Sequence, residues 1–284
     1  MYKRQAAGDG YVWTSGDQAA WRIDPETDDA IRVPVPIAHD GWTGMVVADG
    51  DLWALDVHAN RILRVDPTIA ATRATIDVAN PTSPALAGGG LWIAHEREGG
   101  LSRVDLATER VDIEIADGRG VTAAGDSVWY ASDRDRPDSV LAIEADGRSG
   151  ATIGKISIPV TTGCEFLAAA DERVWSTCSD GLANPPMTHV ATIDPDREDT
   201  TRFELDRWLA GGLIEVGGRV WGLAAAKGVA PAGFIELGPG GPTGRSVELP
   251  TGFAPDDPVV AAGSLWIPWD GTGRLYRFSL RALQ

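Results

Sequence analysis

Short apolar runs alternate with polar turns along the whole chain, a pattern that predicts β-strands rather than helices. Residues 45–48 form one such run, which ends at Asp49-Gly50, a dipeptide that favours tight two-residue hairpin turns. After a second apolar run and a loop, residues 61–65 alternate charged and apolar side chains as a half-exposed strand does. Asp66-Pro67 ends that strand, because proline lacks the N–H that a sheet ladder needs. Residues 73–78 then complete a predicted four-stranded unit.

This unit recurs along the chain, and each copy is marked by a valine or leucine followed by tryptophan. Successive tryptophans of the set are 40, 39, 37, 46, 46 and 45 residues apart. A period of that length is typical of a β-propeller with one four-stranded blade per repeat. We therefore predict an all-β chain that folds as a seven-bladed β-propeller of antiparallel blades. The tryptophans are expected to pack between neighbouring blades, and they are Trp13, Trp53, Trp92, Trp129, Trp175, Trp221 and Trp266.

The two ends of the chain leave the last predicted blade one strand short. The first copy opens with its innermost strand near residues 5–8, and the last copy supplies three strands, the third at residues 275–278. Propellers avoid an open sheet edge by pairing strands from the two ends of the chain. The closing fourth strand of blade 7 is therefore expected to be missing from this fragment and to come from upstream of Gln5 or beyond Gln284.

The first residues suggest why this strand is missing. Tyr2-Lys3-Arg4-Gln5 is the in-frame translation of a common sequencing-adapter end, which would make the chain a metagenomic fragment. Residues 1–5 are accordingly set aside as an artefact, and residues 6–284 are predicted to form a single propeller domain. The alternative is a genuine short N-terminus, with residues 279–284 as a frayed last strand.

Charge and composition narrow the class of partner. With 25 Lys and Arg residues against 41 Asp and Glu residues, the formal net charge is −16. This balance excludes nucleic acid as an expected partner, because phosphate binding needs clustered positive charge. It favours solubility, and cationic partners or metal ions at acidic rims. The chain has no apolar run long enough to predict a transmembrane segment, and a monomer is expected.

The two cysteines bear on the cellular compartment in which the protein resides. Cys164 is expected to begin the first strand of blade 5, and Cys178 to end the second. Counting inward from the Asp171-Glu172 turn places them opposite each other, within reach of a disulfide. A disulfide implies an extracytoplasmic protein, either periplasmic, secreted or surface-attached. The alternative is two reduced thiols in a cytosolic protein.

Candidate chemistry lies on the face formed by the loops that join strands 2 and 3 and by those that join successive blades. His95-Glu96 closely follows Trp92, and either side chain could act as a general base. Asp56, Glu96, Asp133 and Asp270 could together hold Ca²⁺ or Mg²⁺. Aromatic side chains outside the repeated set could line a ligand pocket beside these groups. The candidate ligand-binding residues are Trp42, Asp56, His58, His95, Asp133, Glu165, Trp208, Trp269 and Asp270. The alternative interpretation is solvated loop charges, and aromatics packed under long loops.

The Val/Leu-Trp pair after a glycine-containing hairpin, with the Arg-Ile-Asp-Pro third strand at residues 22–25, resembles a known family. It is similar to the YVTN/YncE-type propellers and their relatives, the streptogramin (virginiamycin B) lyase-like proteins, over residues 6–280. The lyase-like proteins use a metal and a histidine base to open a cyclic depsipeptide by elimination. Their Leu-Trp-Phe-Thr-Glu repeat and histidine cluster have no clear match here, since the four histidines lie in different blades.

These observations favour a non-catalytic exported propeller that binds a small molecule, peptide or protein partner on its loop face. A metal-dependent lyase or lactone-opening hydrolase of the streptogramin-lyase-like type is the alternative, with His95 or Glu96 as the base. A third interpretation is a structural module of a larger protein. The sequence has no phosphate-binding loop, no Gly-x-Ser-x-Gly motif and no His-Glu-x-x-His motif, which removes several other enzyme classes.

Overall fold

A computed structural model of the chain provides the structure. It describes residues 5–16, 18–38, 42–95, 99–132, 140–158, 164–170, 173–180, 187–194, 196–197, 199–205, 208–225, 233–249, 258–269 and 274–283. At some strand ends, among them residues 42, 164–167, 208 and 269, the description covers the backbone and not the side chain.

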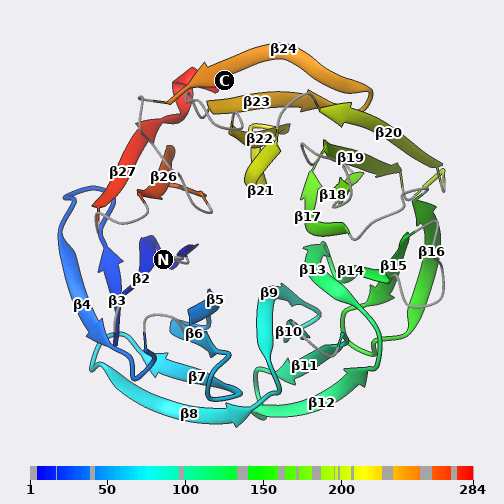
Figure 1. The fold of residues 1–284 in the computed structure, drawn as a ribbon. Coiled ribbons are helices and arrows are strands. Elements are labelled where there is room, and N and C mark those ends of the chain that lie inside the picture. Colours follow the sequence, from blue (N-terminus) through cyan, green and yellow to red (C-terminus); the bar gives the residue numbers. More distant parts are fainter. Residues whose placement is uncertain are drawn as a thin grey trace.

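The chain forms seven antiparallel sheets arranged in a ring around a central axis (Figure 1). Blade 1 contains β1 (Gln5–Gly8), β2 (Tyr11–Gly16), β3 (Ala19–Ile23) and β4 (Ala30–Pro34). Blade 2 contains β5 (Trp42–Ala48), β6 (Asp51–Asp56), β7 (Arg61–Asp66) and β8 (Ala71–Asp77). Blade 3 contains β9 (Pro81–Ala87), β10 (Gly90–His95), β11 (Leu101–Asp105) and β12 (Arg110–Ile115). Blade 4 contains β13 (Arg119–Ala124), β14 (Ser127–Ser132), β15 (Val140–Asp146) and β16 (Thr152–Ile158).

The remaining blades continue the same order. Blade 5 contains β17 (Cys164–Ala170), β18 (Arg173–Asp180), β19 (Met187–Asp194) and β20 (Asp199–Leu205). Blade 6 contains β21 (Trp208–Val216), β22 (Arg219–Ala225), β23 (Gly233–Gly238) and β24 (Gly241–Glu248). Blade 7 contains β25 (Val259–Ala261), β26 (Ser264–Trp269) and β27 (Arg274–Ser279), followed by the short 3-10 helix η2 (Leu280–Ala282).

The prediction of an all-β, seven-bladed propeller is confirmed. In every blade the strands pair in chain order, so the first strand lies nearest the axis and the last lies at the rim. Within the described residues, six blades have four strands and blade 7 has three. Residues 279–283 do not form a frayed last strand: after Ser279 the chain turns into η2, and Leu280 and Leu283 are buried against blades 6 and 7.

The hairpins between the first and second strands follow the predicted turn chemistry. Asp49 and Gly50 both have positive φ, 52° and 78°, and Asp9 and Gly10 repeat this with 51° and 81°. Two consecutive positive φ values define a type I′ turn, whose twist matches that of the flanking strands. The Asp-Gly dipeptides therefore set the register of β1 with β2 and of β5 with β6.

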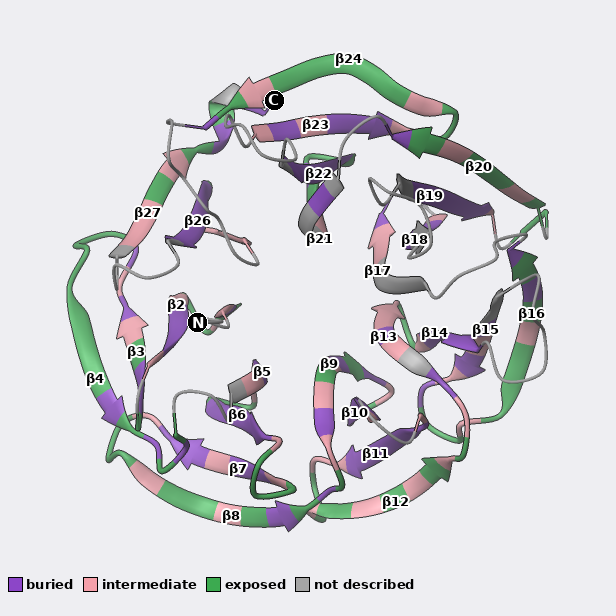
Figure 2. Cartoon of the chain, in the orientation of Figure 1, coloured by how far each residue is buried: buried purple, intermediate pink, exposed green. Residues whose placement is uncertain are grey.

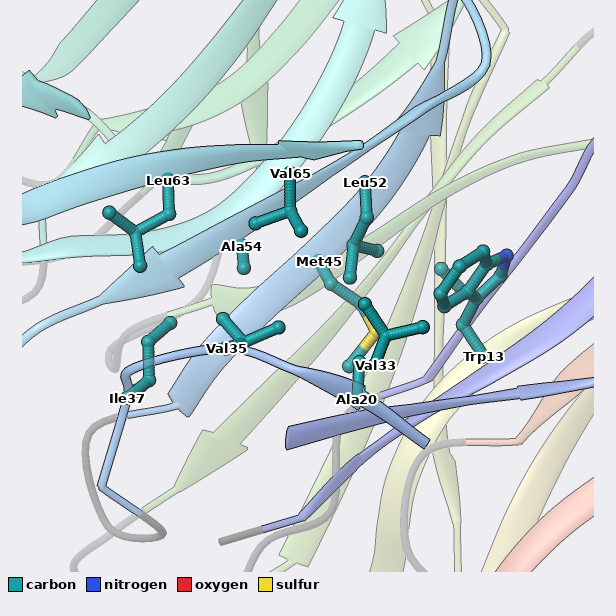
Figure 3. Close-up of a cluster of buried hydrophobic side chains, with 11 residues drawn as sticks. Trp13, Ala20, Val33, Val35, Ile37, Met45, Leu52, Ala54, Leu63 and Val65 are labelled. Atoms are coloured by element: carbon teal, nitrogen blue, oxygen red, sulfur yellow. The ribbon is translucent and has the colours of Figure 1, made fainter. Parts of the chain in front are cut away.

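The seven repeated tryptophans form the seams between blades, as predicted. Their exposed fractions do not exceed 4 %. Trp13 of blade 1, for example, belongs to one buried cluster with Leu52, Leu63 and Val65 of blade 2 (Figure 3). Exposed residues gather instead on the outermost strands (Figure 2). Since each blade buries its tryptophan against the next blade, the buried core repeats once per blade, as the sequence does.

The aspartate that ends the third strand caps the turn that follows it. In blade 2, Asp66 accepts hydrogen bonds from the backbone N–H of Thr68 (2.8 Å) and from the Thr68 hydroxyl and the Arg73 guanidinium. These donors favour the ionised carboxylate and hold the pKa of Asp66 well below its ordinary value. Asp105 and Asp146 repeat the arrangement with Thr108 and Ser149, and the pKa of each is lowered too.

We expect this capping to make stability depend on acid pH. A carboxylate whose pKa is lower in the folded state stabilises the fold above its unfolded pKa of about 4. That stabilisation is lost as the pH falls toward the folded pKa. Asp66→Asn should therefore lower the urea midpoint of unfolding at pH 7. As the pH falls below about 4, the midpoint of the variant should decrease less steeply than that of the wild type. Equal pH dependence in the variant and the wild type would contradict this role of Asp66.

Candidate functional site

The candidate residues lie at one end of the ring, which we call the loop face. It is the face at which the first strand of each blade begins and the second strand ends. The register pairs Trp42 with Asp56 in blade 2, and Trp208 with Ala225 in blade 6. Trp269 ends β26 and pairs with Arg274. These residues therefore lie at strand ends and not in the loops themselves, because the backbone ladder continues through them.

The third residue after the repeated tryptophan holds a recurring place on this face. It is the last residue of the second strand in blades 2, 3 and 4. Its side chain contacts the connection that enters the blade directly in blades 3 and 4, and through Arg61 in blade 2. The sequence singled out two of these residues for chemistry but did not show that they occupy one repeat position. The set with a polar or thiol side chain comprises Asp56, His95, Ser132 and Cys178.

Asp56 fastens blade 2 to the connection from blade 1. One carboxylate oxygen accepts from Arg61 Nε at 3.0 Å, and the other accepts from the backbone N–H of Ala59 at 3.1 Å. Arg61 donates in turn to the carbonyl of Pro36 at 2.9 Å, between β4 and β5. The Asp56 side chain is 6 % exposed. A carboxylate paired with a guanidinium in this way does not fit a cation site, because the fixed positive charge repels the metal.

His95 makes the corresponding contact in blade 3 with both of its ring nitrogens. Nδ1 contacts the carbonyl oxygen of Ala79, in the connection between β8 and β9, and Nε2 lies 2.9 Å from Ser102 Oγ. A carbonyl can only accept, so Nδ1 carries the proton and Nε2 accepts from the Ser102 hydroxyl. The basic lone pair of His95 is therefore engaged by a buried serine that lies opposite Ile93 in the sheet.

Blade 4 has the same arrangement with different side chains. The Ser132 hydroxyl donates to Asp117, in the connection between β12 and β13. Burial, together with the negative charge of Asp117, raises the pKa of the nearby Tyr130 phenol, so it stays protonated. A side-chain link between the second strand and the incoming connection therefore recurs in blades 2, 3 and 4, although the residues that make it differ.

In blade 5 the position is Cys178. Its Cα is the register partner of Cys164, the first residue of β17, as the sequence predicted. A β-bulge between Cys164 and Phe166 produces this pairing, since the regular hairpin register on its own is offset by one residue. The Cys178 side chain is buried, and the described part of the chain holds no free cysteine.

The structure brings only part of the predicted set together. Asp56 and His95 lie at equivalent positions of neighbouring blades, and His58 is exposed in the turn after β6. Glu96, Asp133 and Asp270 lie outside the described residues, as do the side chains of Trp42, Glu165, Trp208 and Trp269. Among the residues that are described, no three His, Cys, Asp or Glu side chains are grouped to hold a metal. The described residues include no helix long and apolar enough to cross a bilayer.

The ring of seven sheets places this chain among the seven-bladed β-propellers. Its structure is similar to Kuenenia stuttgartiensis hydrazine synthase, with a TM-score of 0.78 and 11 % identity over 97 % of this chain and 94 % of that chain. It is also similar to a chain of the mitotic checkpoint complex, with a TM-score of 0.74 and 8 % identity over 98 % and 87 % of the two chains.

The extracellular domain of BT4673 from B. thetaiotaomicron is a third structural neighbour. Its TM-score is 0.66 at 12 % identity, and the match covers 95 % of this chain but 37 % of that chain. No family model matches the chain, and no curated protein sequence matches it. At these identities the likeness shows the fold alone, so the resemblance to the YncE and streptogramin-lyase-like propellers stays a prediction.

Proposed function

We propose that this chain is a non-catalytic, exported β-propeller that binds a small molecule, peptide or protein partner on its loop face. The observation that carries the proposal is the role of Asp56 and His95. The hydrogen-bonding groups of both side chains help to link a strand to the connection from the preceding blade, directly in His95 and through Arg61 in Asp56. Polar groups held in this way stiffen the loop face as a platform and are poorly suited to exchange protons with a substrate.

Two further features support a binding role. Three blades have a tryptophan at a strand end on this face: Trp42 and Trp208 begin the innermost strands β5 and β21, and Trp269 ends β26. Tryptophan is enriched where partners are bound, because it offers a large contact area at little entropic cost. The net charge of −16 favours a cationic partner. The same fold occurs in a chain of the mitotic checkpoint complex, a protein assembly by its name, and in an extracellular domain.

The binding proposal can be tested with a random peptide-display library selected against the immobilised protein. We expect selected peptides to be rich in Lys and Arg and to lose at least tenfold in affinity for Trp42→Ala or Trp208→Ala. Ile69→Ser is the matched control, since Ile69 is 71 % exposed in the turn between β7 and β8 on the opposite face. Peptides that keep their affinity for both tryptophan variants but lose it for Ile69→Ser would place the site elsewhere.

The streptogramin-lyase-like activity is the second candidate, and one observation favours it. The Ala79 carbonyl accepts from Nδ1 of His95, so Nε2, which accepts from the Ser102 hydroxyl, is the nitrogen that would take up a proton if a substrate displaced that hydroxyl. Ca²⁺ or Mg²⁺ bound by Glu96, Asp133 and Asp270 remains a proposal that belongs to this candidate. Turnover of a cyclic depsipeptide, present with Mg²⁺ and absent with EDTA, would establish the lyase and overturn the non-catalytic proposal.

His95→Ala separates the two candidates further. If His95 is a tie between blades, the variant should lose about 1–3 kcal/mol of unfolding free energy, because the Ala79 carbonyl and the Ser102 hydroxyl lose their partner. His58→Ala is the matched control: this histidine is exposed, and we expect a change below about 0.5 kcal/mol. Chemical denaturation measures both values. Unchanged stability in His95→Ala, together with lost turnover, would assign it a catalytic role instead.

We also propose a Cys164–Cys178 disulfide, and with it an extracytoplasmic location. The opposed Cα positions of the two residues support it. A cross-link that closes a loop of about 15 residues should stabilise by roughly 3 kcal/mol. Alkylation without reductant should therefore leave the mass unchanged, and reduction should lower the melting temperature. The Cys164→Ser, Cys178→Ser double variant is the control, since its melting should not respond to reductant. Two alkylated thiols in protein purified under oxidising conditions would refute the disulfide.

A further inference from the structure

The two cysteines of blade 5 occupy a repeat position that neighbouring blades fill with polar side chains. In blades 2, 3 and 4 the links that Asp56, His95 and Ser132 make are hydrogen bonds. In blade 5 the same position is Cys178, and its register partner is Cys164, the first residue of the blade. A disulfide, unlike a hydrogen bond, is opened by thiols, so the link in blade 5 alone depends on redox conditions.

Polar side chains surround Cys178 on the face of blade 5 that packs against blade 4. Cys178 of β18 pairs with His189 of β19, which pairs in turn with Glu204 of β20. Ser176 and Arg202 lie two residues earlier on β18 and β20, so their side chains point to the same face. Directly paired residues of an antiparallel sheet have Cβ atoms about 5 Å apart, so these groups form one cluster around the sulfur.

Ser176 makes the direct contact with the sulfur. Its Oγ lies 3.7 Å from Cys178 Sγ, and the residue is 0 % exposed. A disulfide sulfur has no proton to give, so the hydroxyl donates and the sulfur accepts. This bond becomes stronger when the sulfur is negatively charged, because charge-assisted hydrogen bonds are about twice as strong as neutral ones. Ser176 therefore stabilises Cys178 as a thiolate leaving group.

His189 and Arg202 bring an imidazole and a positive charge to the same place. His189 is 6 % exposed, and its Nδ1 lies 2.9 Å from Arg202 Nη2. A guanidinium can only donate, so Nδ1 accepts and the proton of the neutral imidazole lies on Nε2. Glu204 Oε1, at 3.6 Å from Arg202 Nη2, holds the guanidinium beside the ring. Cationic groups close to a cysteine stabilise its thiolate, so this pair acts in the same direction as Ser176.

Burial decides which sulfur an external thiol attacks. Cys178 is 1 % exposed, so a thiolate in solution cannot approach its sulfur in the folded protein. Attack therefore falls on Cys164, where the chain enters blade 5 on the loop face. The sulfur that then leaves is that of Cys178, and exchange is faster when the leaving thiolate is stabilised. The polar cluster thus surrounds the sulfur that burial assigns as the leaving group.

We propose that Cys164–Cys178 is a thiol-exchange site, at which a low-molecular-weight thiol becomes attached to Cys164 while the protein stays folded. This exchange presupposes the disulfide proposed above. The reagent thiolate forms a bond to the Cys164 sulfur as the protein S–S bond breaks, and the electron pair of that bond goes to Cys178. A second reagent thiolate then displaces Cys164. The two reagent thiols are oxidised to one disulfide, and their two protons end on the two cysteines.

Reduced glutathione is the probe for this exchange. The folded wild-type protein is incubated with it, quenched with acid, and measured by intact mass and peptide mapping. We expect an adduct of one glutathione, located on Cys164, that forms at a rate proportional to the glutathione concentration. Low concentrations of urea should leave that rate unchanged, because the exchange does not require unfolding.

Variants of the polar cluster test the leaving-group role. Ser176→Ala should slow the attachment of glutathione at least tenfold, because the leaving thiolate loses its hydrogen-bond donor. Arg202→Met should also slow it, whereas Arg202→Lys, which keeps the positive charge, should stay within about threefold of the wild type. Ser157→Ala is the matched control, since Ser157 is exposed on β16. A variant that only loosened the fold would expose the disulfide and accelerate its reduction, so slower exchange cannot come from lost stability.

Three results would overturn the proposal. They are glutathione attached to Cys178, equal exchange rates in Ser176→Ala and the wild type, or reduction that occurs only where urea unfolds the protein. If Ser176→Ala fails to fold, the position of the adduct and the urea dependence still decide. Two free thiols in protein purified under oxidising conditions would refute the disulfide itself, so the two failures are distinguishable.

Discussion

Trp53→Ala is expected to reduce the free energy of unfolding by about 3–5 kcal/mol, the range for removing a fully buried tryptophan. Trp53 is 1 % exposed and lies in one cluster with Leu91, Ile93 and Val104 of blade 3. The Arg64 guanidinium stacks 5.3 Å from its ring. Removing the ring leaves a cavity at a seam that the backbone cannot close, because both neighbouring sheets are fixed by their own ladders.

Chemical denaturation followed by far-ultraviolet circular dichroism measures this loss. Trp21→Ala is the matched control, since it removes the same side chain from a position that is 39 % exposed. A loss of about 1 kcal/mol is expected there. Equal losses in the two variants would mean that burial at the seams does not govern stability.

Arg103→Met is the second substitution for which we expect a loss of about 3–5 kcal/mol. Arg103 is 4 % exposed, yet its guanidinium donates to two backbone carbonyls at 3.0 Å, those of Gly147 and Gly88. It also pairs with Asp112. Trp92 Nε1 donates to the same Gly147 carbonyl at 3.0 Å, so a single acceptor in blade 4 holds two side chains of blade 3. Methionine preserves much of the packing and removes every donor.

Packing around Arg103 makes the arrangement specific to this side chain. A Cβ on Gly90 would lie 2.3 Å from Arg103 Nε, so glycine is required there to admit the guanidinium. The matched control is Arg197→Met, because the Arg197 side chain is 78 % exposed and the change should be within about 0.5 kcal/mol. Denaturation midpoints compare the two. A small loss in Arg103→Met would show that water replaces the guanidinium at the carbonyls without cost.

The hairpins and seams were predictable because their causes are local. Asp9-Gly10 and Asp49-Gly50 adopt positive φ at both positions of their hairpin turns, and a tryptophan of the repeated set follows each turn at the same offset. The cysteine pairing was predicted by the same counting, but it depends on a bulge beside Cys164 that no residue pattern marks. The correct pairing therefore rested on a feature that only the backbone reveals.

The roles of the candidate site residues could not be predicted in this way. Asp56 and His95 were predicted to be candidate site residues on the loop face. His95 contacts the carbonyl of Ala79, and Asp56 is linked to the carbonyl of Pro36 through Arg61. A carbonyl acceptor carries no sequence signal because every residue has one. The links between these strands and the connections that enter their blades can therefore be recognised only in the three-dimensional structure.

The sequence by itself determined the fold class and the number of blades. Repeated turns and apolar strands act over a few residues, and their period of about forty residues matches one propeller blade. The tertiary structure alone decided which polar side chains link a strand to the connection from the preceding blade, and why Trp21 is 39 % exposed whereas Leu63, at the same repeat position of blade 2, is buried. Those outcomes depend on contacts between blades, across the closed ring, that no local pattern encodes.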